Sequence, residues 1–178
     1  MSFTSYNRDN GTITFNVTKC SDYWYKKEYV DNALKQIETT SGIKSTMTDK
    51  EKVRQINRFL YTKFNLVFGG TDMYRMMKDK DGSCVEHSKI VFYLCKKNNI
   101  PVQTISLTPK DKYQQGHMIN RVKINGVWYY CDTMWNHGTF GTGKVGEHYL
   151  FMKSLGNDYT KMYSNASNPT VNDYFPGN

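Results

Sequence analysis

Three residues of this chain have the types that acyl transfer by a cysteine nucleophile requires: Cys84, His117 and Asp132. A cysteine thiolate attacks a carbonyl carbon, a histidine carries the proton, and a carboxylate holds the imidazole in one tautomer. The three residues are far apart in the sequence, so this chemistry depends on the elements that bring them together. Local sequence patterns predict each of those elements.

Cys84 is predicted to begin a helix. The segment from Ser83 to Glu86 has the capping-box pattern, in which Ser83 is the N-cap and Glu86 is the third helical residue. The unsatisfied N–H groups of a helix N-terminus favour negative charge, so this position favours a thiolate. The N–H of Cys84 itself is free to donate to a developing oxyanion. Gly82, just before the cap, allows a backbone or a substrate to approach closely.

His117 and Asp132 are predicted to lie on one face of a β-hairpin. The dipeptide Asn125-Gly126 is a strong signal for a two-residue type I′ turn between strands 117–124 and 127–132. In the register that this turn sets, His117 and Asp132 become diagonal neighbours whose polar tips are within reach of each other. The hairpin therefore supplies a base together with a carboxylate to orient it.

Other interpretations of the cysteines and histidines are open. A free cysteine is most often an inert core thiol, an alternative for Cys84 that fits the other cysteines better, namely Cys20, Cys95 and Cys131. His87, one turn after Cys84, is a rival base, but no carboxylate is placed to orient it. A zinc site made of Cys84, His87 and His117 lacks the usual ligand spacing. The remaining histidines, His137 and His148, are expected to be exposed.

Composition argues against several other classes of protein. The formal net charge is +8, but the basic residues come in short pairs rather than in a stripe, which argues against nucleic-acid binding. No segment is long and apolar enough to span a membrane. Residues 1–11 lack the pattern of a signal peptide, and the sequence assigns no cellular compartment. Four cysteines without a Cys-x-x-Cys pair suggest neither a zinc knuckle nor a redox motif.

The pattern along the chain predicts one α+β domain in three parts. Residues 1–47 supply a strand at 12–17 and a helix, capped by Ser21 or Asp22, that packs on the core. Residues 48–155 form the catalytic core, and residues 156–178 form a polar C-terminal tail. Within the core we expect a helix capped at Thr48, a loop at 69–82, the helix of Cys84, a buried strand at 102–107, the hairpin and a last strand at 149–152.

Three spaced motifs resemble the transglutaminase-like superfamily, and its bacterial members in particular. They are Gly82-Ser83-Cys84 at a helix start, Gly116-His117-Met118-Ile119-Asn120, and Trp128-Tyr129-Tyr130-Cys131-Asp132-Thr133-Met134-Trp135. The resemblance covers roughly residues 48–152. It implies a papain-like α+β core, with N-terminal helices and the nucleophile helix packed on an antiparallel sheet. It also implies that Cys84 is the nucleophile, His117 the base and Asp132 the orienting acid.

The motifs depart from the family pattern beside these residues. Met118 stands where the family often has alanine, Ile119 where it often has tryptophan, and the threonine after Asp132 comes one place early. These changes bear on substrate preference more than on chemistry. The family's second oxyanion donor has no match in the sequence; Tyr74 and Trp135 are aromatic candidates, and packing is the simpler role for both.

The residues and the resemblance together predict acyl transfer on a peptide or carboxamide bond through a thioester on cysteine, as in a transglutaminase-like cysteine protease or amidase. The expected partner is a protein or peptide substrate, such as a cell-surface or cell-wall peptide, with no metal and no organic cofactor. Two alternatives stay open. One is a protein-crosslinking transglutaminase, in which a lysine amine replaces water, and the other is a non-catalytic interaction module that retains the fold.

Overall fold

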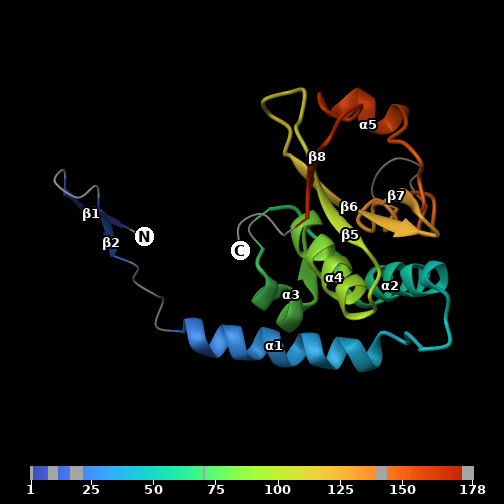
Figure 1. The fold of residues 1–178 in the computed structure, drawn as a ribbon, viewed down its shortest axis with the longest axis horizontal. Helices are drawn as coiled ribbons and strands as arrows, with labels where there is room; N and C mark the ends of the chain where they lie inside the picture. Colours follow the sequence, from blue (N-terminus) through green and yellow to red (C-terminus); the bar gives the residue numbers. More distant parts are fainter. Residues whose placement is uncertain (1, 8–11, 17–21, 70, 139–143, 174–178) are drawn as a thin grey trace.

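The computed structural model describes residues 2–7, 12–16, 22–69, 71–138 and 144–173 of the 178-residue chain (Figure 1). The elements are β1 (Ser2–Asn7), β2 (Thr12–Asn16), α1 (Tyr23–Thr40), α2 (Asp49–Lys63), β3 (Asn65–Leu66), α3 (Met73–Asp79), β4 (Asp81–Gly82), α4 (Cys84–Lys97), β5 (Val102–Leu107), β6 (His117–Ile124), β7 (Val127–Cys131), α5 (Asn157–Met162) and β8 (Thr170–Asn172). Helix α4 packs on an antiparallel sheet and α2 packs on α4, which confirms the predicted α+β class.

The sheet has four strands in the order β7-β6-β5-β8, all antiparallel. The turn between β6 and β7 forms as predicted, with φ of 51° at Asn125 and 82° at Gly126. The predicted register holds from the pair Ile124–Val127 to the pair Asn120–Cys131. The ladder ends there, one residue earlier than expected, because the N–H of Asp132 donates to the carbonyl of Tyr149 at 2.9 Å instead.

Two hydrophobic clusters cover the two faces of this sheet. The first joins helices α1 to α4 with one side of the strands, and Val122 and Ile124 of β6 belong to it. The second contains Ile105 and Ile119, which alternate to the opposite side, together with the segment that follows β7. The sheet is therefore buried on both faces, and the second cluster is the one that surrounds His117.

Both predicted N-caps, Thr48 and Ser83, are present, each is part of a capping box, and they fix where α2 and α4 begin. In α2 the Thr48 hydroxyl accepts from the N–H of Glu51, and the Glu51 carboxylate accepts from the N–H of Thr48. The same reciprocal arrangement of Ser83 and Glu86 starts α4 at Cys84. One face of α2 is apolar and buried: Val53, Ile56 and Leu60, together with Phe64 at the C-cap, are 5% exposed or less.

The segment expected to be a loop at 69–82 contains helix α3 and strand β4. Asp72 caps α3 by accepting from the N–H of Arg75 at 2.8 Å. Charged residues surround Met76 and Met77 in the sequence, so no apolar pattern indicated a helix there. Both methionines are fully buried in the core. Gly82 is needed for packing, because a Cβ there would lie 2.6 Å from the sulfur of Met76. The close approach that we predicted at Gly82 is therefore made by a core methionine.

The C-terminal segment differs most from the expectation. The predicted polar tail at 156–178 instead supplies helix α5 and strand β8, which pairs with β5 at the edge of the sheet. The predicted strand at 149–152 is reduced to a single bridge between Tyr130 and Met152. Phe151 has a φ of 59°, and this left-handed conformation interrupts the extended backbone.

The N-terminal part contributes a hairpin and a helix. Strand β2 forms where a strand was expected, and it pairs with β1, which the sequence did not predict. Asp22 is the N-cap of α1, but its side chain makes no capping hydrogen bond, whereas Ser21 and Cys20 lie outside the described residues. Helix α1 packs against α3 and buries Ile37. In the part of the chain that the structure describes, no helix is long and apolar enough to cross a membrane.

Candidate active site

Cys84 is the first residue of α4, and this N-terminal end of the helix faces a cavity. The carboxylate of Glu86 accepts hydrogen bonds from the N–H of Ser83 at 3.0 Å, from its hydroxyl at 2.6 Å and from the hydroxyl of Thr71. Burial opposes the charge of Glu86, but these hydrogen bonds outweigh it and lower the pKa of Glu86. The first turn of α4 is therefore held rigidly, while Cys84 remains partly exposed.

His117 and Asp132 form a buried pair. The Nε2 atom of His117 lies 2.6 Å from Oδ2 of Asp132, and both side chains are almost completely buried. The other carboxylate oxygen, Oδ1, accepts from the N–H of Trp135 at 3.0 Å. Because Asp132 occupies Nε2, the Nδ1 atom of His117 is the nitrogen that remains for the thiol.

Tyr159 completes the surroundings of Asp132. Its hydroxyl donates to Oδ2 of Asp132 at 2.8 Å, and its ring stacks on Trp135 at a centroid distance of 4.1 Å. Burial, followed by the charge of Asp132, raises the pKa of Tyr159 well above its ordinary value, so the hydroxyl keeps its proton. Asp132 therefore accepts three hydrogen bonds, from a histidine, a tyrosine and a backbone amide.

Two aromatic rings enclose the His117 imidazole. The ring of Trp135 lies 5.9 Å from it and that of Tyr163 lies 5.8 Å from it, both at 19° to its plane. Burial by itself lowers the pKa of His117, but the charge and hydrogen bond of Asp132, joined by those of Cys84, raise it to about 10. The surroundings thus favour an imidazolium, in contact with a carboxylate on one side and a sulfur on the other.

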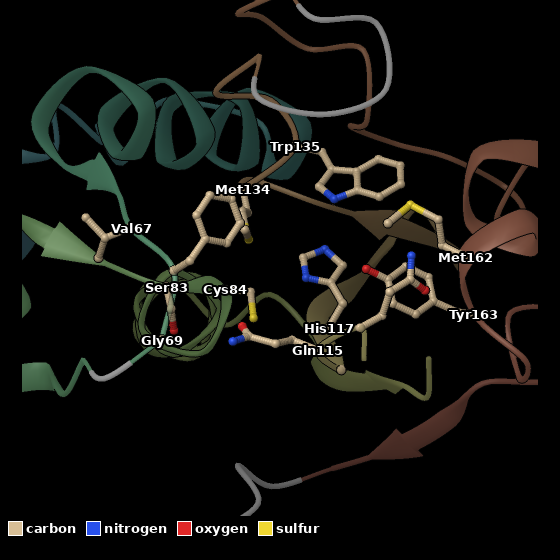
Figure 2. A pocket seen from close by; sticks show the side chains of 13 residues that line it. Val67, Gly69, Ser83, Cys84, Gln115, His117, Met134, Trp135, Met162 and Tyr163 are labelled. Atoms are coloured by element: carbon tan, nitrogen blue, oxygen red, sulfur yellow. The ribbon is translucent and has the colours of Figure 1, made fainter. Parts of the chain in front are cut away.

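A cavity of about 280 Å³ opens beside Cys84 and His117 (Figure 2). In Figure 2 the sulfur of Cys84 points into this space next to the His117 ring. Apolar side chains form much of the wall, among them Val67, Phe68, Met134, Trp135 and Met162. A carbonyl group in the cavity would reach the sulfur, the imidazole and the start of α4 together, which is the arrangement that acyl transfer needs.

Hydrogen bonds tie the helix of Cys84 to the strand of His117. The hydroxyl of Ser88 donates to the carbonyl of Met118 at 2.9 Å, and the side-chain amide of Asn120 donates to the carbonyl of Ser88 at 3.3 Å. Ser88 and Asn120 are both buried. Asn120 belongs to the motif identified in the sequence, but its role of joining α4 to β6 could not be predicted from that motif.

A second pair of buried amides fixes the turn that carries Asp132. The side chain of Asn136 donates to Oδ1 of Asn57 at 2.9 Å and accepts from the N–H of Tyr149 at 2.8 Å. Asn57 in turn donates to the carbonyl of Gly146 at 3.3 Å. Both asparagines are fully buried, so α2 and the turn after β7 are held as one unit. A polar residue on the apolar side of α2 is the sequence signal that could have identified Asn57.

The rival residues lie elsewhere. His87 is fully buried behind the first turn of α4, where its Nδ1 lies 2.8 Å from the carbonyl of Ser83. Its ring meets His137 edge-on at 4.9 Å, so His137 is more enclosed than expected. Tyr74 packs with Tyr25 and Tyr29 near α1. Cys95 and Cys131 are buried in the core. Among the described residues, no group of three or more His, Cys, Asp or Glu side chains is placed to hold a metal ion.

Comparison with known proteins places the chain in a family. No curated protein matches the sequence. Two similar solved structures are "a TGase", with 12% identity and a TM-score of 0.48, and "a Putative Cysteine Protease from Cytophaga hutchinsonii", with 18% identity and a TM-score of 0.41. They match over 89% and 86% of this chain, which spans only 41% and 48% of theirs.

The sequence profile of the transglutaminase-like superfamily matches residues 37–133. This range is more than half of the 178-residue chain, and it includes Cys84, His117 and Asp132. It ends before the C-terminal segment that supplies Tyr159 and Tyr163. The chain belongs to the transglutaminase-like superfamily.

Proposed function

We propose that this protein cleaves a peptide or carboxamide bond by acyl transfer through a thioester on Cys84. The observation that carries the proposal is the line of contacts from Asp132 through His117 to Cys84 at one cavity wall. A superfamily that contains cysteine peptidases and transglutaminases supports the same reaction class. In this proposal Cys84 is the nucleophile, His117 transfers the proton and Asp132 orients the imidazole.

The reaction has two steps. The sulfur of Cys84 attacks the carbonyl carbon to form a C–S bond, and His117 gives its proton to the nitrogen of the leaving amine as the C–N bond breaks. Water then attacks the thioester while His117 accepts one of its protons. The C–S bond breaks, a carboxylic acid leaves, and the thiolate with its imidazolium is restored. Asp132 stabilises the positive imidazole in both steps.

Water is the acceptor that the cavity favours. None of the described side chains that line it is a carboxylate, so a lysine ammonium would find no opposite charge there. The net charge of +8 adds to this disadvantage. A cross-linking transglutaminase is therefore the second candidate. Release of free acid rather than an isopeptide product, measured with glutamine and lysine peptides together, distinguishes the two.

Thiol alkylation tests the proposed site before any substrate is known. Iodoacetamide is added at about pH 6, where ordinary thiols are protonated, and labelling of each cysteine is followed by peptide mass spectrometry. We expect Cys84 to label far faster than the three other cysteines. Burial raises the pKa of Cys131 to about 12 and also raises that of Cys95, so these two serve as slow internal references.

The histidine variants provide the control. His117→Ala should slow labelling of Cys84 by at least about tenfold, since it removes the positive partner of the sulfur. His148→Ala, a change at an exposed histidine, should leave the rate unchanged. If Cys84 labels no faster than Cys95 or Cys131 in the folded wild type, the catalytic proposal fails and the interaction-module alternative replaces it.

A further inference from the structure

We propose that the side-chain amide of Gln115 is the second hydrogen-bond donor to the oxyanion formed during this reaction, and so a catalytic residue. The inference rests on the proposed function and adds a group that neither the sequence motifs nor the family profile assigns. Attack on a carbonyl places a negative charge on its oxygen, and fixed donors near that oxygen lower the barrier. The first donor is the N–H of Cys84, which has no intrahelical acceptor at the start of α4.

Gln115 lines the cavity that Cys84 and His117 also line. In the view of Figure 2 the carboxamide of Gln115 is drawn next to the sulfur of Cys84. A Cβ built on Gly69 would lie 3.7 Å from Nε2 of Gln115, so the amide reaches toward the segment on the other side of Cys84. Gln115 is exposed, and a bound carbonyl oxygen can therefore contact it.

The backbone beside Gln115 is held in place. His117, two residues on, begins β6 and pairs with Leu107 of β5. Between them, a Cβ on Gly116 would lie 3.3 Å from the carbonyl oxygen of Leu107, so glycine allows this close approach to the neighbouring strand. The strand pairing that fixes His117 thus begins two residues after Gln115. Rotation about the last side-chain bond, whose torsion is broad and roughly two-fold, presents either end of the amide to the substrate.

The aromatic candidates do not offer a comparable donor. Tyr74 packs with Tyr25 and Tyr29 and does not line the cavity. Trp135 is 1% exposed, with its ring stacked on Tyr159 and on His117. Among the residues that Figure 2 labels, Gln115 is the exposed one whose side chain carries an N–H donor.

Two reagents separate an oxyanion donor from a structural residue. Acylation of Cys84 by p-nitrophenyl acetate passes through an oxyanion and releases nitrophenolate, whereas iodoacetamide alkylates the same sulfur without forming one. Gln115→Ala should lower the rate constant for acylation about 10- to 100-fold and leave that for alkylation within about twofold. Gln115→Glu, of equal size but negatively charged, should be slower than Gln115→Ala in acylation. The matched change Gln36→Ala, at an exposed glutamine of α1, should alter neither rate.

Each other result overturns the proposal. Unchanged acylation in Gln115→Ala would show that Gln115 donates no hydrogen bond that matters to the oxyanion. An equal loss in both reactions would show that it acts on the thiol or on the fold instead. If the wild type shows neither fast alkylation of Cys84 nor a nitrophenolate burst, the proposed function itself fails, and the role of Gln115 fails with it.

Discussion

Both carboxylate oxygens of Asp132 accept hydrogen bonds from groups of the protein. Oδ1 accepts from the N–H of Trp135, while Oδ2 accepts from His117 and from Tyr159. A buried carboxylate is stable only when such donors surround it, and their arrangement fixes its plane. Asp132 can therefore hold the imidazole of His117 in one tautomer without help from solvent.

Asp132→Asn should lower turnover by on the order of 10³- to 10⁴-fold with little change in substrate binding. Every group around Asp132 is a donor, so either orientation of the asparagine amide turns its NH₂ toward another donor. Steady-state kinetics on a substrate that releases a chromophore measures both quantities. Unchanged turnover would remove Asp132 from the mechanism.

Tyr159→Phe should keep the stacked ring and lose only the hydrogen bond to Asp132. Because that bond reaches a buried charged group, we expect a loss of about 1.5–3 kcal/mol in the free energy of unfolding. Turnover should fall about tenfold with its pH profile displaced, since the basicity of Asp132 acts on His117. Tyr149→Phe, which loses a hydrogen bond to Asp158, is the matched control for the pH profile. The same profile in both variants would refute a positioning role for Tyr159.

At the scale of elements, the first turn of α4 has a role that the first turn of α2 does not have. Both helices begin with a capping box, but only α4 places a cysteine at its first position beside a cavity. Ser83 and Thr71 fix Glu86, which holds that turn. The hydrogen bonds of Ser88 and Asn120 then fix the position of α4 along strand β6. The distance between sulfur and imidazole follows from these contacts.

The two caps offer a paired test. Ser83→Ala and Thr48→Ala should each lower the free energy of unfolding by about 1 kcal/mol, because each removes one N-cap acceptor. Ser83→Ala alone should also slow alkylation of Cys84, because it loosens the turn that presents the sulfur. Urea denaturation and the alkylation assay measure the two effects. Equal alkylation rates in both variants would show that the cap does not position Cys84.

At the scale of the whole molecule, the buried His87 and the partly buried His137, behind the site, make stability depend on pH. The Nε2 atoms of His87 and His137 have no hydrogen-bond partner within the described structure. Burial lowers the pKa of both, and for His137 burial together with the nearby His87 lowers it to about 4. Both rings are therefore neutral in the folded protein near neutral pH.

The sign of the effect follows from proton binding. Between about pH 6.5 and about pH 4 the unfolded chain binds a proton at His137 that the folded chain does not, so the free energy of unfolding decreases as the pH falls. We expect His137→Phe to reduce that acid loss by about 1–2 kcal/mol, allowing for its partial exposure. Denaturant titrations from pH 7 to pH 4 measure it, with the exposed His148→Phe as control. Identical slopes in all three proteins would contradict this assignment.

Local patterns predicted much of the site because much of it is built locally. A capping box placed Cys84 at the start of α4, and an Asn-Gly turn set the register that brings His117 near Asp132. Residues whose roles depend on distant contacts were not predicted. Asn57 and Tyr159 bond to groups far away in the chain, and no local pattern signals such a pairing.

The prediction of secondary structure from the sequence was limited in the same way. Helix α3 was not predicted, because charged residues surround its two core methionines in the sequence. Strand β8 has three residues, too few for an alternating pattern to be visible, and it forms because β5 offers an open edge. A strand at 149–152 was expected because its residues suit one, but the turn at Phe151 prevails.

The place of Tyr159 in the chain has a consequence for the order of events during synthesis. Translation delivers the superfamily segment, with Cys84, His117 and Asp132, before it delivers Tyr159 and Tyr163. A nascent chain at that stage lacks the hydroxyl that bonds Asp132 and one of the two rings that enclose His117. The thiol therefore gains its full surroundings only after residues 159–163 have emerged from the ribosome, and we expect it to become reactive no earlier.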